Sequence, residues 1–169
     1  LPAEFYLDYK YFDLCLNNIF SGSWQLITDI KTIEKNNIYP FTFLPSAINE
    51  PLILINNQNQ IKCFSNVCTH RAHLLADKPC NKNKLRCNYH GRIFNMDGSF
   101  NSMSGFEEAE NFPTEKDNLS SVPSLIWGNF IFVSLTEKID ITPVLDDIEK
   151  RIPNYPLKDL YYNFHFELI

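Results

Sequence analysis

Apolar residues recur along this chain with two different periods, and each period predicts a different kind of element. Helical spacing of apolar side chains predicts an amphipathic helix over residues 9–20, which Gly22 ends. After Gly22, apolar residues alternate with polar ones or cluster in runs of β-forming types, as they do in strands. The predicted strand-containing stretches are residues 23–30, 38–44, 51–65, 91–100, 124–135 and 160–169.

Turn residues and one further helix complete this pattern. Asn56–Gln60 and Gly128–Asn129 each join two apolar runs into a hairpin, and Asp97–Gly98 is a separate turn signal. A second helix is predicted to begin with Thr142 as its N-cap and Pro143 as its first residue. Many short strands with few helices predict an all-β fold, either a sandwich or a barrel-like sheet.

Composition excludes several classes of protein. The longest apolar runs are too short to span a bilayer, so no membrane association is predicted. A formal net charge of −5 argues against general nucleic-acid binding. The five cysteines do not have the spacing of a disulfide framework, so we expect a reducing, cytoplasmic compartment and a metal role for some thiols. Cys15, Cys63 and Cys80 are interpreted as packing residues.

Positive charge is concentrated in one segment. Between Cys68 and Arg92 there are six basic residues and one acidic residue, so this segment carries +5. The remaining nine basic and nineteen acidic residues give −10. One interpretation is a basic loop with no role beyond solvation, and the other is a positive surface that attracts an acidic partner.

Four residues of the same segment have the spacing of metal ligands. Cys68 and His70 form a Cys-x-His pair, and Cys87 and His90 form a Cys-x-x-His pair. The four could bind one tetrahedral zinc ion, or a Rieske cluster in which two thiolates hold one iron and two imidazoles hold the other. Zinc motifs usually pair like with like, whereas each pair here is mixed, so the spacing favours the cluster. Ordinary side chains without a metal are the third alternative.

The segments NVCTHRAHLL and LRCNYHGRIFNMDGSF resemble the Rieske [2Fe–2S] domain of ring-hydroxylating oxygenase large (alpha) subunits. The resemblance covers nearly the whole chain, because the opening helix, the strand at Trp24 and the GNFIFVSL hairpin also stand where that domain has them. It implies a Rieske-type antiparallel β sandwich with an inserted cluster-binding subdomain and short terminal helices. Three positions depart from the family pattern: Ala72 replaces a glycine, Asn88 a proline and Arg92 a tryptophan.

The resemblance also implies limits for the parts of the chain. Residues 1–22 would form an N-terminal helical segment and residues 23–140 the Rieske domain, with its cluster-binding subdomain at about 66–100. Residues 141–169 would be a helix and a strand that lead toward a catalytic domain beyond this chain.

The resemblance implies a ligand set and a function. Cys68 and Cys87 would ligate the inner iron, and His70 and His90 the outer iron. Electrons would come from a reductase or ferredoxin and pass to a mononuclear Fe(II) of a neighbouring subunit, for O2-dependent hydroxylation or dealkylation. That iron would belong to the full-length enzyme only, which by analogy is a homo-oligomer, often a trimer.

Two other functions remain open on the sequence alone: a standalone Rieske ferredoxin, and a zinc-stapled module that only binds a partner. If the cluster is present, we predict a low reduction potential. Rieske proteins of respiratory bc complexes have hydroxyl donors to the cluster sulfurs where this chain has Arg92 and Phe94. Losing such donors lowers the potential within a Rieske range of about −150 to +300 mV.

Overall fold

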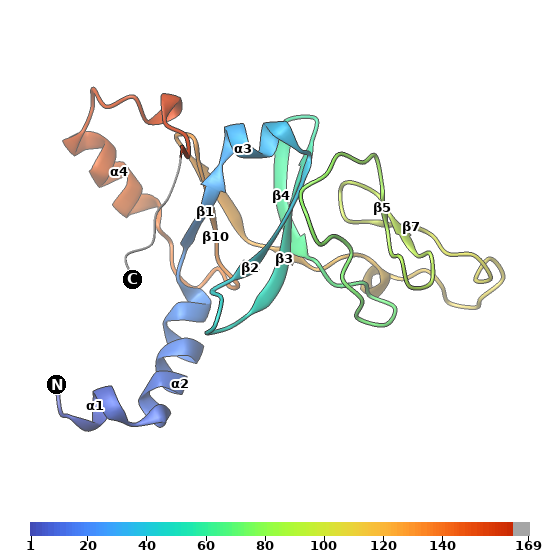
Figure 1. Cartoon of the computed structure of the whole chain (residues 1–169), viewed down its shortest axis with the longest axis horizontal. Coiled ribbons are helices and arrows are strands. Elements are labelled where there is room, and N and C mark those ends of the chain that lie inside the picture. The colour runs from blue at the N-terminus through green and yellow to red at the C-terminus, as the bar shows by residue number, and fades with distance from the viewer. Residues whose placement is uncertain (164–169) are drawn as a thin grey trace. The chain divides into compact units, whose positions relative to one another are not determined.

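The computed structural model describes residues 1–163 of the chain. Within them, most regular structure consists of short strands in antiparallel sheets, with a few short helices (Figure 1). The predicted all-β class is therefore confirmed. The chain forms two compact units, one made of residues 1–35 and the residues from 123 onward, the other of residues 36–122.

The first unit contains one three-stranded sheet and most of the helices. Strand β10 lies between β1 and β9 and is antiparallel to both. The elements of this unit are α1 (Glu4–Leu7), α2 (Tyr9–Asn18), a 3₁₀ turn (Phe20–Gly22), β1 (Gln25–Asp29), α3 (Ile30–Lys35), β9 (Ser124–Trp127), β10 (Phe130–Val133), α4 (Thr142–Arg151) and a 3₁₀ turn (Leu157–Asp159).

The second unit contains two sheets, with strand orders β2-β3-β4-β8 and β5-β6-β7. Its elements are β2 (Ile38–Phe43), β3 (Glu50–Asn57), β4 (Gln60–Ser65), β5 (Leu85–Arg86), β6 (Ile93–Phe94), β7 (Phe100–Ser102), a 3₁₀ turn (Glu115–Asp117) and β8 (Ser121–Val122). Apolar side chains from both sheets form one buried cluster, which also contains Cys68 and Cys87. The loops around β5, β6 and β7 therefore rest on the same core as the larger sheet.

The predicted hairpins are confirmed. Asn57 pairs with Gln60 across the β3–β4 turn, and Trp127 pairs with Phe130 across the β9–β10 turn. Gly98 has a φ of 85°, which its turn between β6 and β7 requires and which glycine adopts without strain.

Two predictions about the helices are wrong, and the prediction of the last strand can be checked only over residues 160–163. The first helix ends at Asn18 rather than at residue 20. Thr142 is not the N-cap of α4: Ile141 holds that position, and the Thr142 N–H is bonded to the Asp140 carboxylate at 2.9 Å. The strand predicted over residues 160–169 is absent at 160–163, and its remainder lies outside the described residues.

The apolar periodicity predicted neither α1 nor α3, although α1 lies within the N-terminal helical segment 1–22 that the resemblance implies. Asp29 directly precedes α3, and its carboxylate accepts hydrogen bonds from the N–H and the hydroxyl of Thr32. Because of this local cap, the chain becomes helical at Ile30, where the alternating pattern predicts a strand. No helix in the described part of the chain is both long and apolar enough to cross a bilayer.

Candidate metal centre

The two predicted ligand pairs lie on turns with the same backbone hydrogen bonds. In each turn, the cysteine N–H donates to the carbonyl of the fifth residue after it, and the N–H of the fourth residue donates to the cysteine carbonyl. The distances are 2.9 Å (Cys68 N to His73 O), 3.0 Å (Ala72 N to Cys68 O), 2.8 Å (Cys87 N to Arg92 O) and 3.0 Å (Gly91 N to Cys87 O). Two matched turns therefore present one thiol and one imidazole each.

The fourth residue after each cysteine is in the left-handed backbone region. Ala72 has a φ of 50° and Gly91 a φ of 75°. Glycine adopts this conformation freely, whereas alanine is strained there because of its Cβ. The glycine that the family usually has in place of Ala72 thus has a backbone reason.

The two cysteines lie together in the core. Cys68 and Cys87 are each 2% exposed, and their thiols contact one another. Burial raises the pKa of Cys68, and the neighbouring Cys87 raises it further, although backbone N–H groups of His70 and Arg71 donate to the sulfur and lower it. A cationic metal at this position would offset the cost of forming two adjacent thiolates.

The two histidines lie together nearer the surface. The ring centroids of His70 and His90 are 4.9 Å apart. Desolvation lowers the pKa of His70 most, and the charges of His90, Arg71 and Arg92 lower it further. A neutral imidazole is the form that binds a metal, so this environment favours ligation.

An aromatic side chain lies against each imidazole. Tyr89 lies against His90 with ring centroids 3.8 Å apart, and Phe106 meets His70 edge-on at 6.0 Å. His73, the other histidine of the first turn, is exposed and faces Tyr89 at 5.8 Å. These rings pack beside the imidazoles but leave His90 exposed and His70 half-buried.

This arrangement contains the two like pairs of ligands that a two-iron Rieske cluster requires. A tetrahedral zinc site needs its ligands to converge on one point, whereas a Rieske cluster takes a thiolate pair and an imidazole pair on separate irons. The side chains here form one buried thiol pair and one imidazole pair.

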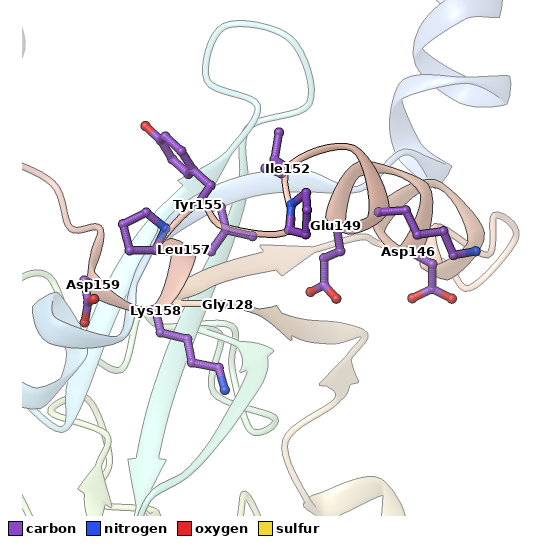
Figure 2. A pocket seen from close by; sticks show the side chains of 11 residues that line it. Gly128, Asp146, Glu149, Ile152, Tyr155, Leu157, Lys158 and Asp159 are labelled. Carbon is purple, nitrogen blue, oxygen red and sulfur yellow. The ribbon is translucent and has the colours of Figure 1, made fainter.

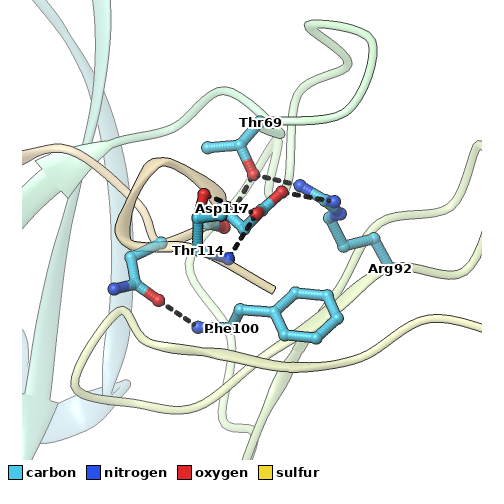
Figure 3. Close-up of polar contacts among 6 residues, drawn as sticks. Thr69, Arg92, Phe100, Thr114 and Asp117 are labelled. Carbon is cyan, nitrogen blue, oxygen red and sulfur yellow. Dashed lines mark hydrogen bonds and ion pairs between the residues drawn. The ribbon is translucent and has the colours of Figure 1, made fainter. Parts of the chain in front are cut away.

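A buried polar group beside the site could not be seen in the sequence. Arg92 is 3% exposed and donates to the Thr69 hydroxyl at 2.6 Å and to the Asp117 carboxylate at 2.9 Å (Figure 3). Thr69 in turn donates to the Asp117 backbone carbonyl at 2.9 Å. Burial raises the pKa of Asp117, but the Thr114 N–H and the Arg92 guanidinium outweigh it and hold that pKa below its usual value.

The other cysteines do not join the site. Burial raises the pKa of Cys63 to about 12, so this thiol stays protonated as a packing residue. Cys80 packs against the same core, and Cys15 is partly exposed on α2. All five cysteines are free of disulfides. His165 lies outside the described residues.

A pocket of about 680 Å³ occurs in the first unit, between α4, the segment after it and the turn at Gly128 (Figure 2). Acidic, basic and apolar side chains line it, including Glu149, Leu157 and Lys158. None of the predicted ligands contributes to its lining. The predicted ligands and the lining of this pocket are therefore different residues.

Comparison with known proteins decides the family. A sequence profile described as the Rieske [2Fe–2S] domain matches residues 23–113, more than half of the chain. The chain belongs to the Rieske [2Fe–2S] domain family. Choline monooxygenase of Beta vulgaris is 31% identical over 140 residues, which cover 82% of this chain and 31% of that relative. The carnitine monooxygenase oxygenase subunit of Escherichia coli K12 is 28% identical over 95% of this chain and 41% of its own length.

Solved Rieske oxygenases have the same fold. The apo quaternary ammonium Rieske monooxygenase CntA superposes with a TM-score of 0.78 and 22% identity, over 94% of this chain and 47% of that chain. A naphthalene 1,2-dioxygenase variant superposes with a TM-score of 0.72 and 22% identity, over 86% and 33%. The predicted similarity to ring-hydroxylating oxygenase large subunits is confirmed. The chain spans less than half the length of these relatives.

Proposed function

We propose that this chain is the Rieske electron-transfer domain of a ring-hydroxylating-type oxygenase. The observation that carries the proposal is the separation of the four side chains into a buried thiol pair, Cys68 and Cys87, and a more accessible imidazole pair, His70 and His90. When bound, a [2Fe–2S] cluster supplies one-electron transfer. The cysteines would hold the inner iron and the histidines the outer iron.

The two sides of the predicted site differ in their exposure. The thiols face the apolar core, whereas the imidazoles stand nearer the surface, so the histidine side is the side that an electron partner can approach. The nitrogen of each imidazole that is not bound to metal can donate a hydrogen bond to a carboxylate of an acceptor protein. Tyr89 and Phe106 pack against these rings but leave His90 exposed, so a partner can approach it directly.

The electron donor in this proposal is an acidic reductase or ferredoxin. The basic residues of the segment from Cys68 to Arg92 are exposed, except for Arg92. Exposed positive charge on the segment that carries the predicted ligands would accelerate the encounter with an acidic donor, and salt would screen that effect. With reduced plant-type ferredoxin as the probe, Lys82→Glu combined with Lys84→Glu should slow reduction at low salt. Lys150→Glu combined with Lys158→Glu, two exposed positions outside this segment, is the matched control. Equal rates for wild type and both double variants would contradict this donor.

The whole protein, in this proposal, passes electrons to a mononuclear iron in a catalytic domain of a neighbouring subunit. The name of one related structure includes inter-subunit electron transfer, which supports a homo-oligomer.

Choline and carnitine, in the names of the relatives, are quaternary ammonium compounds, and we propose that substrate class. Oxygen consumption by the full-length enzyme with choline or carnitine, compared with naphthalene, tests it. A gene that encodes no catalytic domain would instead support a standalone ferredoxin.

A cysteine series tests the ligand set. Cys68→Ser and Cys87→Ser should each lose iron, sulfide and visible colour, because each removes one ligand of the inner iron. Cys15→Ser and Cys80→Ser are matched controls that change a thiol outside the site, and they should keep all three. Full iron content in either of the first two variants would remove that cysteine from the proposed ligand set.

A further inference from the structure

One buried guanidinium joins the two turns that present the predicted ligands. Arg92 lies two residues after His90, and its backbone carbonyl accepts the Cys87 N–H at 2.8 Å. Its side chain reaches the other turn, where Nη1 donates to the Thr69 hydroxyl at 2.6 Å. Thr69 stands between Cys68 and His70 in the sequence. Arg92 therefore closes the Cys87–His90 turn with its backbone and contacts the middle of the Cys68–His70 pair with its side chain.

A third segment fixes this contact. Arg92 Nη2 donates to Asp117 Oδ1 at 2.9 Å, and the Thr69 hydroxyl donates to the Asp117 backbone carbonyl at 2.9 Å (Figure 3). Asp117 is itself held by Thr114, whose N–H and hydroxyl donate to Oδ2 at 2.8 and 3.0 Å. The three residues thus form a closed ring of interactions, in which Arg92 contacts both Thr69 and Asp117, and Thr69 contacts the Asp117 backbone.

The Arg92 side chain is buried although it is charged, and charged side chains are rarely buried unless they are paired. The Arg92 side chain is 3% exposed, against 18% for Asp117, and the rings of Phe100 and Phe112 lie 5.1 and 5.4 Å from its Cζ. Its Nε is buried without a hydrogen-bond partner among the described residues. Apolar residues often stabilise a fold as well as a buried ion pair does, so stability alone does not explain this one.

We propose that Arg92 is a positioning residue that, through Thr69 and Asp117, sets the separation between the Cys68–His70 pair and the Cys87–His90 pair. This inference rests on the proposed function, because it takes these four residues as the ligands of a [2Fe–2S] cluster. The guanidinium suits the task because its planar fork donates to two partners at once in fixed directions. Partners of this kind, outside the ligands themselves, hold ligands in the orientation that the metal requires.

The test compares three variants of the holoprotein. Arg92→Met removes the fork but keeps much of its apolar volume. Arg92→Lys keeps the charge but offers a point donor, and Thr69→Val removes the acceptor at nearly constant shape. The control is Arg151→Met on α4, which breaks an Arg–Asp pair of the same 2.9 Å length whose side chains are 76% and 58% exposed.

Three readouts separate positioning from mere stability: the rate of cluster loss to a chelator, the EPR g values after dithionite reduction, and the midpoint potential. We expect Arg92→Met to lose its cluster about 10- to 100-fold faster than wild type. Thr69→Val should keep its iron but shift the g values and the potential, and Arg92→Lys should fall between Arg92→Met and wild type. Arg151→Met should match wild type in all three.

The inference is overturned if Thr69→Val and Arg92→Lys both keep wild-type g values, potential and rate of cluster loss. That result would leave the cluster itself, and the proposed function, intact. A wild-type chain that binds no iron and sulfide would instead defeat the proposed function before any variant is compared. If Arg92→Met does not fold, Thr69→Val and Arg92→Lys still decide the question.

Discussion

At the scale of single residues, the spacing of Cys68, His70, Cys87 and His90 was enough to predict the candidate site. The pattern of four ligands is visible because the two residues of each pair are close in sequence, and closely spaced cysteine and histidine are typical of metal sites. The roles of Arg92 and Thr69 were not predictable. Their partner Asp117 lies 25 residues beyond Arg92, and an arginine, a threonine and an aspartate have no characteristic spacing. Only the folded backbone brings them together.

Ala72 offers a test of the turn geometry. Because its φ of 50° strains an alanine, Ala72→Gly should raise the free energy of unfolding by about 1 kcal/mol. The control is Ala47→Gly, at a turn position of the same unit without positive φ, which should lower it by about 0.5 kcal/mol. Urea unfolding measures both. Destabilisation of similar size in the two variants would show that the Ala72 turn is not strained.

At the scale of elements, hairpins were predictable and short helices were not. The Asp97–Gly98 and Gly128–Asn129 turns carry residue types that their backbone conformations require. Helix α3 was missed because residues 23–30 alternate like a strand, and only the Asp29 cap, with Thr32 three residues later, signals the change. Thr142 was misplaced as an N-cap because Asp140, two residues earlier, supplies the acceptor instead.

Gly98 tests the packing of the β6–β7 turn. A Cβ at Gly98 would stand 2.4 Å from the Phe64 ring, in addition to the strain of a φ of 85°. Gly98→Ala should therefore lower the free energy of unfolding by about 2–4 kcal/mol. Gly105→Ala is a matched control, because Gly105 has a φ of 82° but nothing within 4 Å of the added Cβ. Its cost should be near 1 kcal/mol. Equal costs would mean that Phe64 moves away freely.

Asp29 tests the cap of α3 through pH. Burial raises the pKa of Asp29, but hydrogen bonds from the backbone of Tyr162 and from Thr32 and Lys31 outweigh it, so the pKa is lowered in the folded state. A lowered folded-state pKa contributes stability above the unfolded-state pKa and loses it as the pH falls through the folded-state value. Asp29→Asn should cost about 1 kcal/mol near pH 7 and less toward pH 3. Asp13→Asn, at an exposed position, should cost little at either pH, and parallel curves would contradict the role of Asp29.

At the scale of the whole molecule, the fold follows from the pattern of apolar and polar residues, whereas the side of the site that a partner could approach follows from burial. The sequence predicted an all-β Rieske fold, and the relatives superpose over most of this chain. The spacing alone could not reveal that the thiols lie in the core and the imidazoles nearer the surface, because that depends on how the turns sit on β4, β5 and β6. The family resemblance implied this arrangement through its inner and outer iron. The division into residues 1–22, 23–140 and 141–169 stays a prediction.

The surroundings of the site predict a low reduction potential. Phe94 is fully buried and has no hydroxyl, and the Thr69 hydroxyl donates to Asp117 rather than to a cluster sulfur. Fewer donors to sulfur leave the reduced cluster less stabilised. A redox titration should therefore give a midpoint in the lower part of the Rieske range, below about 0 mV. A midpoint well above about +100 mV would contradict this prediction.

The central claim is that Cys68, His70, Cys87 and His90 hold a Rieske cluster. Its most direct test is the iron, zinc and acid-labile sulfide content of anaerobically purified protein, measured with an EPR spectrum after dithionite reduction. We predict two irons and two sulfides per chain, no zinc, and the reduced signal of a histidine-ligated cluster. One zinc per chain without sulfide, colour or EPR signal would contradict the account and leave a zinc-stapled binding domain in its place.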